Sequence, residues 1–176
     1  MERVCVARFR DAAFFYGEDR KLKLADRLPA LKGVTFHQKL GSYFDKAQRL
    51  VKLVDLMTAQ GWLTKAQGAQ ARQAAELCKA DLTTLTVREF TELQGQVGGI
   101  YLEREGLPAA TARAVYWHYH PVATGAEDPP RRDEVGEPAV FGAVSLADKL
   151  DTLAGYFSLG QEPRGSSDPY GLRRAA

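Results

Sequence analysis

The stretch that decides the fold class is YFDKAQRLVKLVDLMTAQ, residues 43–60. Its apolar residues recur at spacings of three and four, which places them on one face of a helix. The members of that face are Phe44, Ala47, Leu50, Val51, Val54 and Met57. The stretch therefore predicts an amphipathic helix that packs against a hydrophobic core.

The sequence after Gly61 predicts a second helix that returns along the first. Thr64 is suited to cap it, and residues 66–79 are rich in alanine and glutamine. Its small-residue face, which favours close helix packing, consists of Ala71, Ala74, Ala75 and Cys78. We expect the two helices to form an antiparallel hairpin.

The rest of the chain adds helices and little strand. We expect helices over residues 88–105, 108–119 and 139–157, and a short extended segment at residues 34–36. Residues 4–17 hold many apolar side chains, a density that suits docking better than an independent helix. The predicted fold class is mainly α.

Three segments are predicted along the chain. Residues 1–35 form a short N-terminal connecting segment that packs on the core, and residues 36–160 form the helical domain. Residues 161–176 begin a following helix or linker that stops within about two turns. Within the domain, residues 121–138 form a proline-rich loop.

Composition sets limits on the class of protein. The 176 residues, 45% of them hydrophobic, suffice for one sizeable core, and 24 Lys and Arg against 22 Asp and Glu leave a net charge of only +2. Any nucleic-acid-binding patch is therefore local. Cys5 and Cys78 fit neither a disulfide framework nor a zinc site, and no apolar run approaches the ~18 residues that span a bilayer. We expect a cytoplasmic protein with no membrane partner.

One acidic residue raises a question about function. Asp148 lies inside the apolar helical run LADKLDTL, residues 146–153. Burial of an ionised carboxylate costs several kcal/mol unless a cation compensates it. A simpler interpretation puts Asp148 and Asp151 on the solvated side of the helix, paired with Lys149 and its neighbours.

The order of the candidate residues resembles the HD superfamily of metal-dependent phosphohydrolases. In that all-α fold a His, a His-Asp pair and a later Asp hold a divalent metal. The corresponding positions in this chain are Lys46, Ala80, Asp81 and Asp148, with His118 at a further His position. Two imidazoles are thus replaced by an ammonium and a methyl group, which cannot ligate. We expect no metal, and we expect Lys46 to pair with Asp81 or Asp148 in place of the ion.

Each of these residues also has an ordinary structural interpretation. Asp81 is typical of a helix terminus or turn, and His118 of a histidine at the edge of a core. We favour structural roles for Asp81, His118 and Asp148 over catalysis. The sequence has no phosphate-binding glycine loop, nucleophile elbow or Cys-His signature, so independent catalysis lacks support.

Longer segments resemble a more specific family. They are EFTELQG (89–95), GGIY (98–101), HYHP (118–121), ADKLDTL (147–153) and GSSDPYGLRRA (165–175), together with DAAFF, LKGVTF and KLGS upstream. The chain is thereby similar to the bacterial glycyl-tRNA synthetase beta subunit from near residue 3 to residue 176. The resemblance implies an internal HD-like domain fragment whose metal ligands are incomplete.

The resemblance also implies partners and a cofactor outside this fragment. A separate alpha subunit would hold the catalytic site with ATP and Mg, and the beta subunit would serve tRNA(Gly) through this and its remaining domains. The fragment itself would carry no cofactor. We expect Arg164, Arg173 and Arg174 to contact either the RNA backbone or the next domain, and we weigh these two alternatives equally.

Three functions follow from these observations. The first is a degenerate HD-like domain that supports tRNA positioning and subunit architecture for ATP-dependent glycylation, without catalysis of its own. The second is an HD-type nucleotide phosphohydrolase, against which Lys46 and Ala80 argue. The third is a purely structural spacer.

Overall fold

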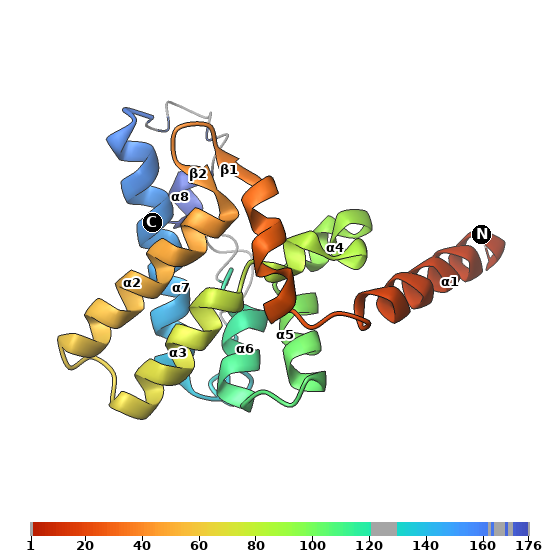
Figure 1. Ribbon diagram of the computed structural model, residues 1–176, viewed down its shortest axis with the longest axis horizontal. Coiled ribbons are helices and arrows are strands. Elements are labelled where there is room, and N and C mark those ends of the chain that lie inside the picture. The colour runs from red at the N-terminus through yellow and green to blue at the C-terminus, as the bar shows by residue number, and fades with distance from the viewer. Residues whose placement is uncertain (1, 121–129, 162, 164–167, 169–170, 176) are drawn as a thin grey trace.

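The computed structural model describes residues 2–120, 130–161, 163, 168 and 171–175, and Figure 1 shows their arrangement. The mainly α prediction is confirmed, because helices dominate these residues and a small two-stranded sheet accompanies them. The HD-like topology and the three-segment division stay predictions.

The predicted hairpin consists of α2 (Tyr43–Ala59) and α3 (Lys65–Leu77). Each helix begins with a capping box, in which the capping hydroxyl and the third residue of the helix exchange hydrogen bonds: Ser42 with Asp45, and Thr64 with Gln67. The apolar face of α2 is buried, and one charged residue, Lys46, is buried with it. The local signals in the sequence therefore found both helices and their starts.

The helix expected over residues 88–105 is interrupted, so that prediction is wrong in its middle. The chain instead forms α4 (Leu85–Glu89), the 3-10 turn η3 (Thr91–Leu93) and α5 (Gln96–Arg104). Gly95 has φ of +82°, a conformation that only glycine adopts readily, and it separates η3 from α5.

Three helices pack against α3. The chain continues into α6 (Ala109–Trp117), α7 (Pro138–Ser158) and the short α8 (Leu172–Ala175), and α3 contacts α2, α6 and α7. A Cβ atom on Gly99 would approach Tyr116 Cβ to 2.5 Å, so this glycine is what allows α5 and α6 to pack closely. The bundle leaves the C-terminal end of α3 facing the middle of α7 (Figure 1).

A short hairpin precedes α2. The predicted extended segment is β1 (Thr35–His37), which pairs antiparallel with β2 (Gly41–Ser42), with Thr35 opposite Ser42. The rings of Phe36 and Tyr43 meet edge to face at 5.3 Å beside the start of α2. This hairpin places two aromatic side chains above the region where α2 faces α7.

The N-terminal residues form α1 (Glu2–Asp19), followed by the 3-10 segment η1 (Ala25–Gly33). The expectation that residues 4–17 would not form an independent helix is wrong, because α1 is continuous and extends away from the bundle (Figure 1). Its last residue, Asp19, is 1% exposed and accepts hydrogen bonds from the backbone N–H groups of Leu85 and Thr86 and from the hydroxyls of Thr86 and Tyr101. One buried carboxylate thus fastens α1 to the start of α4.

The apolar core lies between α2, α3, α6 and α7, and it includes Leu50, Val54, Ala74, Val115 and Val144. None of the helices in the described part of the chain has the length and apolar character needed to cross a bilayer.

Candidate functional site

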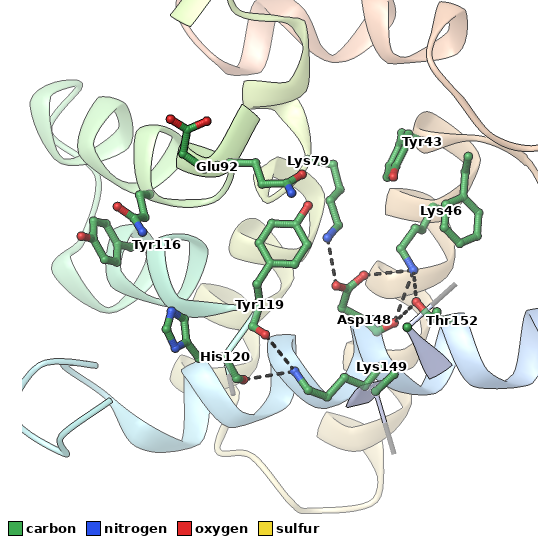
Figure 2. A pocket seen from close by; sticks show the side chains of 15 residues that line it. Tyr43, Lys46, Lys79, Glu92, Tyr116, Tyr119, His120, Asp148, Lys149 and Thr152 are labelled. Atoms are coloured by element: carbon green, nitrogen blue, oxygen red, sulfur yellow. Dashed lines mark hydrogen bonds and ion pairs between the residues drawn. The ribbon is translucent and has the colours of Figure 1, made fainter. Parts of the chain in front are cut away.

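A cluster of buried charges lies where α2, the end of α3, the end of α6 and the middle of α7 meet (Figure 2). At its centre is the carboxylate of Asp148, which is 7% exposed. The interpretation that placed Asp148 and Asp151 on a solvated helix face is therefore wrong, because both are buried. Their burial requires compensating cations.

Lys46 supplies the first of these cations. Its Nζ lies 3.0 Å from Asp148 Oδ1 and 3.0 Å from Asp151 Oδ2, and it also donates to the hydroxyl of Thr152 at 2.9 Å. The Phe36 ring covers it at 4.5 Å. The predicted ion pair between Lys46 and Asp148 is present, so the charge that the sequence placed on the apolar face of α2 has its partner on α7.

Lys79 supplies the second cation, and the sequence analysis missed it. Its Nζ donates to Asp148 Oδ2 at 2.9 Å, lies 2.9 Å from Nε2 of His118 and stands 3.9 Å from the centroid of the Tyr119 ring. Burial on its own lowers the pKa of Lys79, but the Asp148 carboxylate more than offsets this, and the pKa is raised. The residue is an ammonium with all three N–H directions occupied.

A signal for Lys79 was present in the sequence. Lys79 lies four residues after Ala75 on the small-residue face of α3, so helical periodicity placed it toward the core. Lys46 lies on the apolar face of α2 for the same reason, four residues before Leu50. A lysine on an apolar face is the pattern that would have found both.

The two lysines hold Asp148 in its ionised form. Burial raises the pKa of a carboxyl, but Lys79 and then Lys46 overcome this and hold the pKa of Asp148 well below its usual range. Asp151 is compensated further by Arg49, whose Nε and Nη2 lie 2.5 and 3.2 Å from its two carboxylate oxygens. The cluster is a network of buried ion pairs joining α2 and α3 to α7.

His118 is fully buried and takes part in this network. Its Nδ1 lies 2.6 Å from the carbonyl oxygen of Val115, which can only accept, so Nδ1 carries the proton and Nε2 accepts from Lys79. Burial, followed by the nearby Lys79 ammonium, lowers the pKa of His118 to about 3. The imidazole is therefore neutral, and both of its nitrogens are engaged.

Asp81 lies apart from both lysine ammoniums, so the alternative pairing of Lys46 with Asp81 is wrong. Asp81 Oδ2 accepts from the backbone N–H groups of Gly95 and Gly98 at 2.6 and 3.3 Å. Burial raises the pKa of Asp81 to about 6 despite these hydrogen bonds. Its role in the structure is to hold the turn before α5.

Four candidate positions remain, and the structure describes some of them. Ala80 is fully buried and presents a methyl group. Arg173 is exposed on α8, and its N–H is capped by the carboxylate of Asp168. Arg164 and the side chain of Arg174 lie outside the residues that the structure describes.

A divalent metal does not fit this set of donors. Lys79 Nζ lies between Asp148 and His118, where a metal bound by those two side chains would have to lie. Within residues 2–120, 130–161, 163, 168 and 171–175, no three His, Cys, Asp or Glu side chains come close enough to share an ion. The electrostatic site is built from ammonium groups in place of metal ligands.

A cavity of about 430 Å³ opens beside the charge cluster (Figure 2). Lys46, Lys79 and Asp148 contribute to its inner wall, and aromatic side chains, glutamine side chains and Lys149 form much of the rest. The arrangement can bind a ligand by charge, stacking and hydrogen bonding, because it offers groups for each.

Comparison with known proteins identifies the family. The family model for the glycyl-tRNA synthetase beta subunit matches residues 1–176. This chain belongs to that family.

The chain is similar to curated glycine–tRNA ligase beta subunits over nearly all of its length. It is 45% identical to the one from Phenylobacterium zucineum over 174 residues, which is 99% of this chain and 25% of the relative. It is 47% identical to the one from Methylobacillus flagellatus and 43% identical to the one from Neisseria meningitidis, with 99% of this chain and 24% of each relative covered. The chain thus spans about a quarter of the length of the glycyl-tRNA synthetase beta subunits that it matches.

Proposed function

We propose that this chain is a non-catalytic, degenerate HD-like part of a glycine–tRNA ligase beta subunit. It supports the binding and positioning of tRNA(Gly) and the architecture of the subunit in the cytoplasm. In this proposal, ATP- and Mg-dependent glycylation takes place on a separate alpha subunit. The family match over residues 1–176 supports the assignment to this enzyme.

The observation that carries the non-catalytic role is the state of Asp148. This carboxylate faces two ammonium groups, with Lys46 at 3.0 Å and Lys79 at 2.9 Å. Two positive charges occupy the place of the charge that a divalent ion would bring. A phosphohydrolase needs its carboxylates and imidazoles as metal ligands, and here the lysines already occupy them. The charge network stabilises the bundle instead.

A role with tRNA draws on an exposed arginine near the cavity. Arg173 lies exposed on α8, and α8 also contributes Ala175 to the cavity wall. Guanidinium groups bind phosphate oxygens in a bidentate manner, which suits contact with an RNA backbone. The net charge of +2 favours a local contact over a general affinity for nucleic acid.

The experiment uses the complete enzyme with the three candidate arginines replaced together by alanine: Arg164, Arg173 and Arg174. We expect KM for tRNA to rise several-fold at nearly unchanged kcat, and the difference to shrink as salt increases. Lys52→Ala, at an exposed position on α2, is the matched control. Unchanged KM in the triple variant would favour the spacer function, and metal-dependent hydrolysis of a nucleotide by the purified chain would favour the hydrolase.

A further inference from the structure

We propose that the cavity beside the buried lysines binds one nucleotide unit. Its phosphate contacts Lys149, and its base lies between aromatic side chains and glutamine amides. The source of the nucleotide, an unpaired RNA nucleotide, rests on the RNA role proposed above. The binding chemistry itself rests on the cavity.

Lys149 gives the first support for a phosphate site, because within the described residues no carboxylate contacts its ammonium group. Its Nζ donates to the carbonyl oxygens of Tyr119 and His120 at 3.5 and 3.1 Å (Figure 2). It also donates to the Ser145 hydroxyl at 3.0 Å, and all three acceptors are neutral. Across the described residues, no Asp or Glu oxygen lies within 4.0 Å of it. Burial lowers the pKa of Lys149, as expected of a cation without a contact anion. An anionic ligand would replace the longest of these contacts, the one to the Tyr119 carbonyl at 3.5 Å, and would supply the charged partner that the ammonium lacks.

The other charges in the inner wall and directly behind it do not neutralise Lys149. The carboxylates of Asp148 and Asp151 are shared among three cations, Lys46, Lys79 and Arg49. That group therefore carries one positive charge in excess before Lys149 is added. The inner wall attracts anions.

Two further carboxylates lie near the cavity, and neither contacts Lys149. Asp81 turns toward the N–H groups of Gly95 and Gly98, where its charge is held by hydrogen bonds. Glu92 is exposed to solvent, which screens its charge. The phosphate site is therefore confined to the part of the wall near Lys149.

The aromatic side chains are the second argument. Tyr43, Tyr116 and Tyr119 line the cavity, and each is only half-buried, so part of each ring remains accessible. Lys79 stands 3.9 Å from the Tyr119 ring centroid and covers one face of that ring. Tyr43 meets Phe36 edge to face at 5.3 Å and Tyr116 meets Trp117 at 4.8 Å, so each of these two rings offers its remaining accessible part to a flat ligand. Stacking of a base on an aromatic ring is favourable and tolerates any base.

The amides are the third argument. Gln94 and Gln96 line the same cavity, and within the described chain neither side-chain amide has a hydrogen-bond partner. An amide group offers one acceptor and two donors, which pair with the edge of a nucleobase. Inorganic phosphate would use Lys149 alone, whereas a nucleotide uses the ammonium, the rings and the amides together. The cavity volume of about 430 Å³ falls within the range of small-ligand sites.

The test is calorimetric titration of the purified chain with four ligands: adenosine monophosphate, adenosine, inorganic phosphate and a single-stranded RNA octamer. We expect the monophosphate to bind about tenfold tighter than adenosine, which lacks the charge-assisted contact of about 1.5 kcal/mol with Lys149. It should also bind more tightly than inorganic phosphate, which lacks the contacts with the aromatic rings and the amides. Lys149→Met should abolish the preference for the monophosphate over adenosine, and Lys52→Met, at an exposed site on α2, should preserve it.

A second variant keeps the proposal testable if Lys149→Met fails to fold. Gln94 is exposed, so Gln94→Ala leaves the fold intact, and it should weaken the monophosphate several-fold while leaving phosphate unchanged. Competition between the monophosphate and the octamer would make RNA the source, and binding of the monophosphate alone would make it a free nucleotide. Both results support the cavity, although the second contradicts the RNA role.

Three results would overturn the nucleotide site. The first is no binding of the monophosphate at millimolar concentration. The second is phosphate binding as tight as that of the monophosphate. The third is octamer binding that neither the monophosphate nor Lys149→Met disturbs, which would leave the RNA role standing at another surface.

Discussion

Lys79→Met tests the central physical claim, that one buried carboxylate is balanced by two ammonium groups. The variant keeps the aliphatic length of the side chain and removes the charge. Asp148 loses its 2.9 Å partner and keeps Lys46 at 3.0 Å, while His118 Nε2 loses its donor. Removal of one member of a buried ion pair costs about 3–5 kcal/mol, which includes the carboxylate left uncompensated.

The assay is denaturant unfolding followed by circular dichroism. We expect the free energy of unfolding to fall by about 3–5 kcal/mol, and the melting temperature to fall by roughly 6–20 °C for a chain of this length. Lys52→Met, at an exposed position, should stay within about 0.5 kcal/mol of the unmodified protein.

The same variant should also change how the free energy of unfolding depends on pH. The pKa of Asp148 is depressed in the folded protein, so its stabilising contribution is present above the unfolded pKa and is lost as pH falls. Without Lys79 the depression is smaller, so the variant loses less on acidification. The unfolded pKa is about 3.9, so the destabilisation by Lys79→Met should be nearly equal at pH 7 and pH 5 and smaller at pH 3.

A double-mutant cycle with Asp148→Asn separates the pair from its surroundings. If the charges interact directly, the double variant should be less destabilised than the sum of the single variants by at least about 1 kcal/mol. A loss below 1 kcal/mol for Lys79→Met, or additive single variants, would refute the claim that these charges sustain each other.

Three further predictions concern other buried groups. Asp19→Asn should destabilise the protein by about 2–4 kcal/mol, measured by denaturant unfolding, because the carboxylate accepts from two backbone N–H groups and from the hydroxyls of Thr86 and Tyr101; a loss below 0.5 kcal/mol would contradict this anchor. The pKa of His118 is about 3 in the folded state against 6.5 when unfolded, so the stability contributed by the neutral imidazole is lost as pH falls below 6.5. The decrease in unfolding free energy from pH 7 to pH 5 should therefore be about 2 kcal/mol smaller in His118→Gln than in the unmodified protein. Equal decreases in the two proteins would contradict a lowered pKa for His118. Burial raises the pKa of the Cys78 thiol to about 12, so in a Cys5→Ser variant a thiol reagent should modify Cys78 only after denaturation, and rapid modification of the native variant would show that the core is open.

Local patterns predicted some elements well and others badly. The helices over residues 43–60 and 66–79 were found because apolar periodicity and a capping residue point to the same boundaries. The helix expected over residues 88–105 was broken because the N–H groups of Gly95 and Gly98 bond to Asp81, 14 and 17 residues earlier in the chain. The pattern within residues 88–105 does not include Asp81, so it could not reveal this interruption.

The candidate site was predicted in outline for the same reason. Lys46, His118 and Asp148 were singled out and do meet in one network, while Lys79 was overlooked. Of the two partners offered for Lys46, Asp148 is correct, and Asp81 has the turn role that the sequence favoured for it. The position of a residue on a helix face tells whether it is buried. The identity of the group that it meets depends on how helices far apart in sequence are arranged.

The sequence alone determined the helical character, the buried faces of α2 and α3 and the family, because these depend on periodicity and on residue identities along the chain. The tertiary structure alone decided that two lysines share the Asp148 carboxylate, since their partners lie 102 and 69 residues away. Electrostatic interactions act through space at a few ångströms, and only the folded chain fixes those distances.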